Sequence, residues 1–244
     1  MIQEDEGYFF GLGAFETVAV ENGIPVLLEK HYARLYQAAA FLGLSLCKEQ
    51  LEEEVGKALE KPEIQTGRNV MKITVSQKNL MVTTRENTYQ TADYERGFTA
   101  AYAKTRRNET SPFTYHKTFN YGDCILEKRK AKEAGIQEPV FLNTKGEIAE
   151  GATTNIFFVQ KGKLLAPPLG CGMLPGILRQ YLYETYEIQE QILLPEMVET
   201  FDEMFVTNSL LGIMPVRQLE DFVFPGMEVG RKLLKEYCKE FFFA

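Results

Sequence analysis

Residues 146–158 read GEIAEGATTNIFF, and this stretch decides the expected fold of the second half of the chain. Its second part is a continuous apolar run, which predicts a buried strand over about 155–160 that follows a turn at Lys145-Gly146. Glu150 lies between small residues just before that strand. This position suits a carboxylate directed into a binding site, although an acid that caps the end of a strand would give the same pattern.

Helix and strand signals alternate on both sides of this stretch. Pro175 suits the first turn of a helix, and apolar residues at helical spacing predict the other helices. Short apolar runs bounded by turn residues predict the strands. These patterns indicate a larger C-terminal domain with a mainly β core flanked by helices. The expected helices are 121–134, 175–186 and 227–241. The expected strands are 139–143, 204–207 and 213–216.

The first hundred residues predict a smaller α+β domain. Apolar segments flank Glu21-Asn22-Gly23, and an Asn-Gly pair in that setting favours a hairpin turn. Further along, we expect helices from Glu29 to Gly43 and over 48–60, and strands over 71–75, 81–84 and 98–103. Residues 105–114 carry no period of either kind. The expected organisation is therefore a domain at 1–104, a linker at 105–114 and a domain at 115–244.

The composition is that of a folded globular protein, with 45% hydrophobic and 25% charged residues among 244. A net charge of -7 argues against broad nucleic-acid binding, which needs a basic surface. Four scattered cysteines and two histidines predict neither a metal site nor a disulfide framework. The acidic N-terminus lacks a secretory pattern, and no apolar run reaches about 18 residues. We therefore expect a cytoplasmic protein without a membrane span.

A lysine among aromatic residues is the first candidate for chemistry. Residues 115–121 read YHKTFNY, which places Lys117 just ahead of an expected helix. A lysine that is partly removed from water can become neutral and attack a carbonyl, although a solvated surface lysine is the simpler interpretation of the residue alone. His116 is its neighbour on an extended segment, so its side chain points to the opposite side and we interpret it as structural.

Two further segments predict an anion site. Residues 172–179 read GMLPGILR, and a helix that begins after glycine exposes unpaired N–H groups that favour phosphate. Residues 205–216 read FVTNSLLGIMPV, in which Ser209 could add a hydroxyl group. In the first half, HYARL at 31–35 carries Arg34 off the apolar stripe of its helix, where an arginine is most simply solvated.

Taken in order, these motifs resemble those of the fold-type IV pyridoxal 5′-phosphate (PLP) enzymes, which include branched-chain and D-amino-acid aminotransferases and 4-amino-4-deoxychorismate lyases. The resemblance runs from about Gly7 to the C-terminus. It implies a two-domain α/β (α+β) fold and PLP as cofactor. It implies that Lys117 forms the Schiff base and that Glu150 pairs with the pyridine nitrogen. It also implies that Leu174 packs against the cofactor ring. The implied phosphate ligands are Arg34, the backbone of Ile177 and Leu178, and the hydroxyl of Ser209.

Within this group, the motifs TNSLLGIMPV, LPGILR and GLGAFET most resemble the aminodeoxychorismate lyases. The implied reaction converts 4-amino-4-deoxychorismate to 4-aminobenzoate and pyruvate, a step of folate biosynthesis. Two alternatives stay open: an aminotransferase for D-amino or branched-chain amino acids, and a non-catalytic protein that binds PLP or phosphate. Leu178 departs from the hydroxyl residue that aminotransferases commonly have there. The family's usual N-terminal strand pair is also missing before Gly7, which puts the substrate-side wall in doubt.

The implied substrate is a small amine that carries carboxylates, so a cation should face it. Arg107 is the candidate because it lies in the segment that leads to Lys117, with Arg106 as the alternative. Thr17 and Asn208 could add polar contacts to the same substrate. By resemblance we also expect a homodimer.

Overall fold

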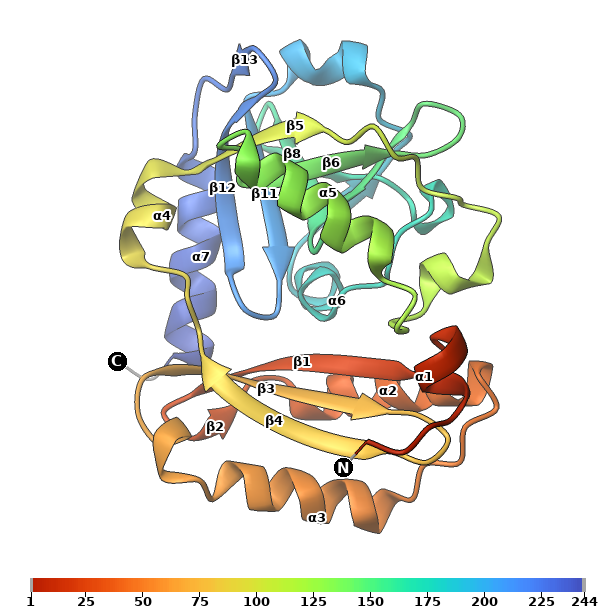
Figure 1. Cartoon of the computed structure of the whole chain (residues 1–244). Coiled ribbons are helices and arrows are strands. Elements are labelled where there is room, and N and C mark those ends of the chain that lie inside the picture. Colours follow the sequence, from red (N-terminus) through yellow and green to blue (C-terminus); the bar gives the residue numbers. More distant parts are fainter. Residues whose placement is uncertain (1, 243–244) are drawn as a thin grey trace. The chain divides into compact units, whose positions relative to one another are not determined.

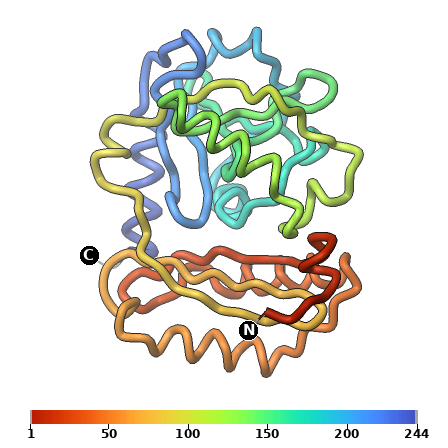
Figure 2. Tube along the Cα trace, in the orientation of Figure 1, coloured from red at the N-terminus to blue at the C-terminus, as the bar shows by residue number. Residues whose placement is uncertain are grey.

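The computed structural model describes residues 2–242 (Figure 1). Its Cα packing separates two compact units, and each is described by itself. The first unit holds the described residues up to 88, together with 116–121 and 241–242; the second holds 89–115 and 122–240. The chain can be followed through these four changes of unit in Figure 2. The division differs from the expected one, because the Lys117 segment belongs to the first unit and the expected linker to the second.

The first unit contains a four-stranded sheet in the order β2-β1-β3-β4. The strands are β1 (Ala14–Glu21), β2 (Ile24–Pro25), β3 (Arg68–Val75) and β4 (Leu80–Glu86). All neighbours are antiparallel, and β1 pairs with β3 along its whole length. Asn22 and Gly23 both have positive φ between β1 and β2, which confirms the hairpin expected from the Asn-Gly pair.

The helices of this unit are α1 (Glu6–Phe10), α2 (Leu28–Phe41), α3 (Lys48–Leu59) and the short 3₁₀ helix η1 (Pro62–Ile64). Of these, α2, α3 and η1 bury residues in one core with β1 and β3. The expected apolar stripes of α2 and α3 are confirmed, because Leu35 and Leu51 are buried in one core with Ile73 of β3. Inward-facing residues of β1 therefore lie against α2, which matters for the site described below.

The second unit is built on a nine-stranded mixed sheet, with the order β10-β9-β8-β11-β12-β5-β6-β7 and β13 added to β12. The strands are β5 (Phe98–Tyr102), β6 (Glu138–Leu142), β7 (Ile148–Gly151), β8 (Asn155–Gln160), β9 (Lys163–Ala166), β10 (Ile188–Glu190), β11 (Glu203–Asn208), β12 (Gly212–Leu219) and β13 (Phe222–Val223). The strand over 98–103 was expected in the small domain. Instead β5 runs parallel to β6 and β12, because its apolar residues Phe98 and Ala100 complete the core of this sheet.

The second unit carries α4 (Thr91–Arg96), α5 (Gly122–Glu133), α6 (Ile177–Thr185) and α7 (Glu228–Phe241), with 3₁₀ helices η2 (Pro112–Tyr115), η3 (Leu169–Cys171) and η4 (Pro195–Thr200). The structure confirms a two-part α+β fold with a mainly β core flanked by helices in its larger part (Figure 1). Among residues 2–242, no helix has the length and apolar character needed to cross a membrane.

Candidate active site

The Lys117 segment extends the sheet of the first unit by a short antiparallel pairing with β1. Phe15 N–H donates to the carbonyl of Lys117 at 3.0 Å, and the bridge pairs Ala14 with Thr118. The Lys117 side chain is half-buried, and its Nζ lies 4.4 Å from the ring centroid of Phe15 and 5.1 Å from that of Tyr121. The aromatic surroundings expected from the motif are therefore present, and Phe15 is a contributor that the sequence did not single out.

A second amine lies on the same aromatic ring. Lys72 of β3 has its Nζ 5.0 Å from the Phe15 centroid, so two lysines contact one ring. Thr17 is the cross-strand partner of Lys72 and is half-buried, which puts its side chain on the Lys72 face of the sheet. Lys72 was missed because nothing in its local sequence separates it from a solvated lysine.

Arg34 is buried, so the solvated interpretation of this residue is wrong. Its Nε donates to Glu16 Oε1 at 2.7 Å and its Nη2 donates to Glu16 Oε2 at 2.8 Å. His31, one helical turn earlier on α2, donates from Nδ1 to Glu16 Oε2 at 2.6 Å. Glu16 is fully buried on the helix-facing side of β1. Side chains alternate between the two faces of β1, and this alternation could have indicated that Glu16 points inward. A buried carboxylate needs a cationic partner, which here is Arg34.

The charges in this cluster shift two pKa values. Burial alone would raise the pKa of Glu16, but the charge of Arg34 and the hydrogen bonds from Arg34 and His31 hold that pKa well below its ordinary value. Burial lowers the pKa of His31, and the nearby charge of Glu16 offsets this only in part because Arg34 and Lys117 act in the same direction as burial. The cluster is therefore an ionised carboxylate held by a guanidinium and a neutral imidazole.

In the second unit, the candidate acid Glu150 lies on β7 and is held from two sides. Arg107 Nε donates to Glu150 Oε1 at 2.8 Å, and Arg107 Nη2 contacts the same oxygen. The backbone N–H of Leu174 donates to Oε2 at 3.1 Å. Glu150 is buried, and the Arg107 guanidinium also lies 5.1 Å from the ring centroid of Phe141. An acid directed into the protein is thus confirmed, but the Arg107 charge is directed at Glu150, whereas we expected it at a substrate.

The expected anion segments lie at the start of α6 and at the turn between β11 and β12. Gly176 precedes the first turn of α6, and the side chains of Ile177 and Leu178 in that turn are buried. Asn155 Nδ2 donates to the carbonyl of Leu174 at 2.9 Å. Its Oδ1 occupies the place that a Cβ on Gly176 would take, so a larger residue there would displace the Asn155 amide.

Ser209 lies in the β11–β12 turn and is half-exposed. The preceding Asn208 fixes this turn: its Oδ1 accepts the N–H groups of Leu210 and Leu211, both at 2.9 Å, and its Nδ2 donates to the carbonyl of Thr153 at 3.1 Å. Both ends of the Asn208 amide thus have partners within the protein, and its contact with a substrate stays a prediction.

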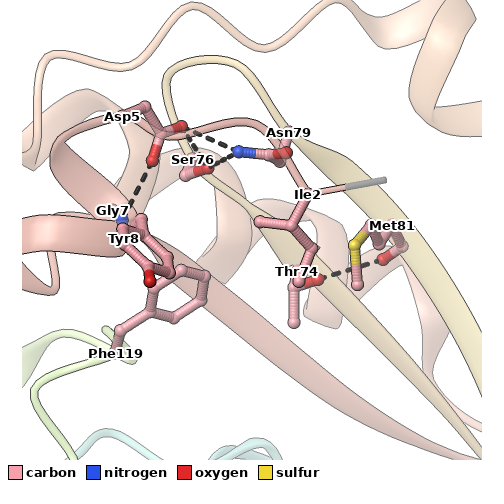
Figure 3. Close-up of a pocket in the computed structure, with 9 residues that line it drawn as sticks. All are labelled: Ile2, Asp5, Gly7, Tyr8, Thr74, Ser76, Asn79, Met81 and Phe119. Atoms are coloured by element: carbon pink, nitrogen blue, oxygen red, sulfur yellow. Dashed lines mark hydrogen bonds between the residues drawn. The ribbon is translucent and has the colours of Figure 1, made fainter.

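Two other features of the first unit, the His116 ring and a pocket, are not part of the candidate site. His116 stacks on Phe41 with a centroid distance of 4.2 Å, and burial lowers its pKa, in line with a structural role. A pocket of about 240 Å³ lies near the N-terminal helix, with Asp5, Ser76 and Phe119 among its lining residues (Figure 3). The Asp5 carboxylate accepts hydrogen bonds from Ser76 and Asn79, so it serves to fix the N-terminal segment.

The two units supply groups of the types that PLP requires. The first offers an amine against aromatic rings, a buried arginine, and a buried His31 Nε2 that has no hydrogen-bond partner among residues 2–242. The second offers a buried carboxylate fixed by Arg107 and a glycine-led helix start. An amine, an acid and anion-binding groups fit the aldehyde, the pyridine nitrogen and the phosphate of that cofactor.

This fold is that of the fold-type IV enzymes. The chain belongs to the class IV aminotransferase family, whose model matches residues 13–219. It is 28% identical to a putative branched-chain-amino-acid aminotransferase of Methanocaldococcus jannaschii, over 97% of this chain and 89% of that protein. It is 26% identical to the aminodeoxychorismate lyase of Bacillus subtilis, over 89% and 80% of the two chains. The crystal structure of 4-amino-4-deoxychorismate lyase from Pseudomonas aeruginosa superposes with a TM-score of 0.86 at 26% identity, over 100% of this chain and 96% of that one.

Proposed function

We propose that this protein is a PLP-dependent lyase that converts 4-amino-4-deoxychorismate to 4-aminobenzoate and pyruvate. The observation that carries the choice of substrate is Lys72, whose Nζ lies on the same Phe15 ring as Nζ of Lys117. A cation on the ring that also contacts the proposed catalytic amine suits a substrate with carboxylates and disfavours the apolar side chain of a branched-chain amino acid. The likeness to the Bacillus subtilis lyase supports the same choice.

Lys117 carries the proton steps in this proposal. Its amine forms the Schiff base with the cofactor, which when bound supplies an electron sink. Released by the incoming substrate amine, Lys117 removes the proton from the carbon that bears the substrate nitrogen. It later returns a proton as the enolpyruvyl group leaves as pyruvate. The ring centroids of Phe15 and Tyr121 lie 4.4 and 5.1 Å from Nζ, so the amine that carries both transfers is flanked by aromatic surfaces.

The remaining residues bind and orient. Glu150, held in place by its ion pair with Arg107, pairs with the pyridine nitrogen, and Leu174 packs against the ring. Arg34, Ser209 and the first backbone N–H groups of α6, at Ile177 and Leu178, take the phosphate. Lys72 and Thr17 face the substrate carboxylates. Expulsion of the enolpyruvyl group after that proton has been removed leaves an aromatic ring, which makes the elimination effectively irreversible.

The second candidate is an aminotransferase of the same fold. Its support is the likeness to the putative branched-chain-amino-acid aminotransferase of Methanocaldococcus jannaschii. In that case Lys117 would move a proton between two carbons and nothing would be expelled. The proposed cofactor residues are the same in both, so only the fate of the substrate separates the two activities.

The cofactor proposal is tested first by absorbance. Purified protein should show an imine band that borohydride abolishes, and mass spectrometry of the reduced protein should find the cofactor on the peptide with Lys117. Lys117→Ala should remove both signals. A protein that PLP cannot reconstitute, or a modification at another lysine, would contradict the proposal.

The reaction is tested by product analysis. Incubation with 4-amino-4-deoxychorismate should release 4-aminobenzoate and pyruvate, whereas D-alanine or a branched-chain amino acid with 2-oxoglutarate should give no transfer. Lys72→Met should raise KM for the carboxylate substrate by about tenfold, with partial recovery in Lys72→Arg. The exposed Lys57 of α3 offers a matched control, because Lys57→Met should change nothing. Transfer without elimination would overturn the lyase in favour of the aminotransferase.

A further inference from the structure

We propose that the Thr207 hydroxyl is an additional ligand of the cofactor phosphate, and that Asn155 is the positioning residue that holds the phosphate loop beside it. This inference rests on the proposed cofactor. Thr207 is only 1% exposed, and its Oγ1 has no hydrogen-bond partner within the described part of the chain. A buried hydroxyl without a partner destabilises a protein, so its presence needs a reason.

The position of Thr207 supplies the first part of that reason. It pairs directly with Asn155 across the antiparallel strands β11 and β8. Side chains of directly opposite residues project from the same face of a sheet. Asn155 extends on that face to the loop before α6, where its Nδ2 donates to the carbonyl of Leu174. The Thr207 hydroxyl therefore lies on the face of the sheet that carries the start of α6.

The start of α6 supplies the second part. The first N–H groups of this nine-residue helix lack partners within the helix, and the positive end of its dipole favours an anion. A hydroxyl on the same face can rotate to donate its hydrogen to an anionic oxygen. A phosphate monoester matches both donors, because its dianion offers three acceptor oxygens. Valine would fill the volume of Thr207 without any polar group, so the hydroxyl is expected to serve a ligand.

Asn155 sets the distance between these donors. Its amide nitrogen holds the Leu174 carbonyl at 2.9 Å, and its amide oxygen lies against Gly176 where a Cβ would otherwise be. Its backbone pairs with Thr207 in the sheet. One side chain thus joins the strand end that carries Thr207 to the loop that begins α6, without itself contacting the cofactor.

The test compares binding of PLP with binding of pyridoxal, which lacks the phosphate. Apo protein would be titrated with each, and the dissociation constants read from the imine absorbance. Thr207→Val should weaken PLP binding by about tenfold and leave pyridoxal binding unchanged, whereas Thr207→Ser should keep the affinity for PLP. Asn155→Asp should weaken PLP binding by more than tenfold, because it removes the donor to Leu174 and adds a negative charge. The ³¹P chemical shift of bound PLP should move in both weakened variants.

Thr154 provides a matched control. It is also buried, but its hydroxyl donates to Glu138 at 3.1 Å. Thr154→Val should lower the melting temperature of the apo protein, whereas Thr207→Val should leave it unchanged or raise it, because the removed hydroxyl has no partner to lose. An unchanged ratio of PLP to pyridoxal affinity in Thr207→Val, or a lower apo melting temperature, would overturn the inference. If the wild type itself fails to bind PLP through Lys117, the proposed function fails instead.

Discussion

Each unit of this protein contains one buried carboxylate held by an arginine, and the two pairs are built differently. In the first unit, Arg34 donates to both oxygens of Glu16, and His31 donates to one of them as well. In the second unit, Arg107 donates from Nε and Nη2 to Oε1 of Glu150, and Oε2 accepts the backbone N–H of Leu174.

The difference separates a structural carboxylate from one suited to chemistry. Glu16 joins β1 to α2, and charged or ring donors reach both of its oxygens. In Glu150, Oε1 accepts from the Arg107 guanidinium and Oε2 accepts from the backbone N–H of Leu174. A carboxylate oxygen that accepts from a backbone N–H gains more from a cationic ring nitrogen than one that already accepts from a cation. This contrast supports our proposal that Glu150, and not Glu16, pairs with the cofactor.

The largest expected effect is on folding, from Glu16→Gln. Removing this charge leaves Arg34 buried without its ionic partner, which should lower the free energy of unfolding by about 3–5 kcal/mol. Urea unfolding followed by circular dichroism measures the change. Glu53, an exposed partner of Lys57 on α3, provides the control, and Glu53→Gln should leave the urea midpoint unchanged. Equal midpoints for the two variants would mean that the Glu16 cluster is not a structural element.

The next effect is on the cofactor, from Arg107→Met. If Arg107 acts through Glu150, this variant should bind PLP about tenfold more weakly and shift the pH titration of the imine band. Arg107→Lys should recover part of the affinity, because a lysine restores the charge without the planar fork. If instead Arg107 bound the substrate directly, as the sequence predicted, KM would rise while cofactor affinity and spectrum stayed the same. The two outcomes are therefore exclusive.

The contrast between the pairs also shows how far the sequence could lead. Local signals predicted most elements correctly, because the Asn22-Gly23 turn, the stripes of α2 and α3 and the start of α6 depend on neighbours in the chain. The Lys117 motif likewise carries its aromatic neighbour Tyr121 with it. Such features are encoded within a few residues.

Partners distant in sequence were not predictable in the same way. Taken alone, the Arg34 motif indicated a solvated arginine, because its own helix gives no sign of Glu16, which lies on a different element. Arg107 was expected at the substrate because the partner that takes its charge is 43 residues away. The domain boundary was misplaced for the same reason: β5 looks like any other apolar strand until its pairing with β6 and β12 is known.

A smaller effect should appear in the pH dependence of stability. The pKa of His31 is lowered in the folded state by burial, so the unfolded chain binds more protons near its ordinary value of 6.5. The contribution of neutral His31 to stability is complete above pH 6.5. It is lost as the pH falls toward the lowered pKa that His31 has in the folded protein. The free energy of unfolding should therefore drop between pH 7.5 and 5.5, by at most about 1.4 kcal/mol per pH unit for this group.

His31→Gln isolates this contribution. His116 has a pKa shifted in the same direction, and Glu21 has a raised pKa that acts in the opposite sense at lower pH, so the wild-type slope is a sum. The difference between wild type and His31→Gln removes both. A difference that does not change with pH would show that His31 is not a neutral buried partner of Glu16.

The smallest expected signal is alkylation at Cys171 in the second unit, compared with Cys47 in the first. Burial, followed by the charge of Glu147, raises the pKa of Cys171 to about 12, so its thiolate fraction at pH 8 is on the order of 10⁻⁴. Cys47 is exposed. Iodoacetamide should modify Cys47 readily in the native protein and leave Cys171 unmodified, as peptide mass spectrometry would show. Because Cys171 precedes the loop whose Leu174 N–H holds Glu150, rapid labelling there would mean that this loop opens and that the second carboxylate pair is less firmly fixed than the first.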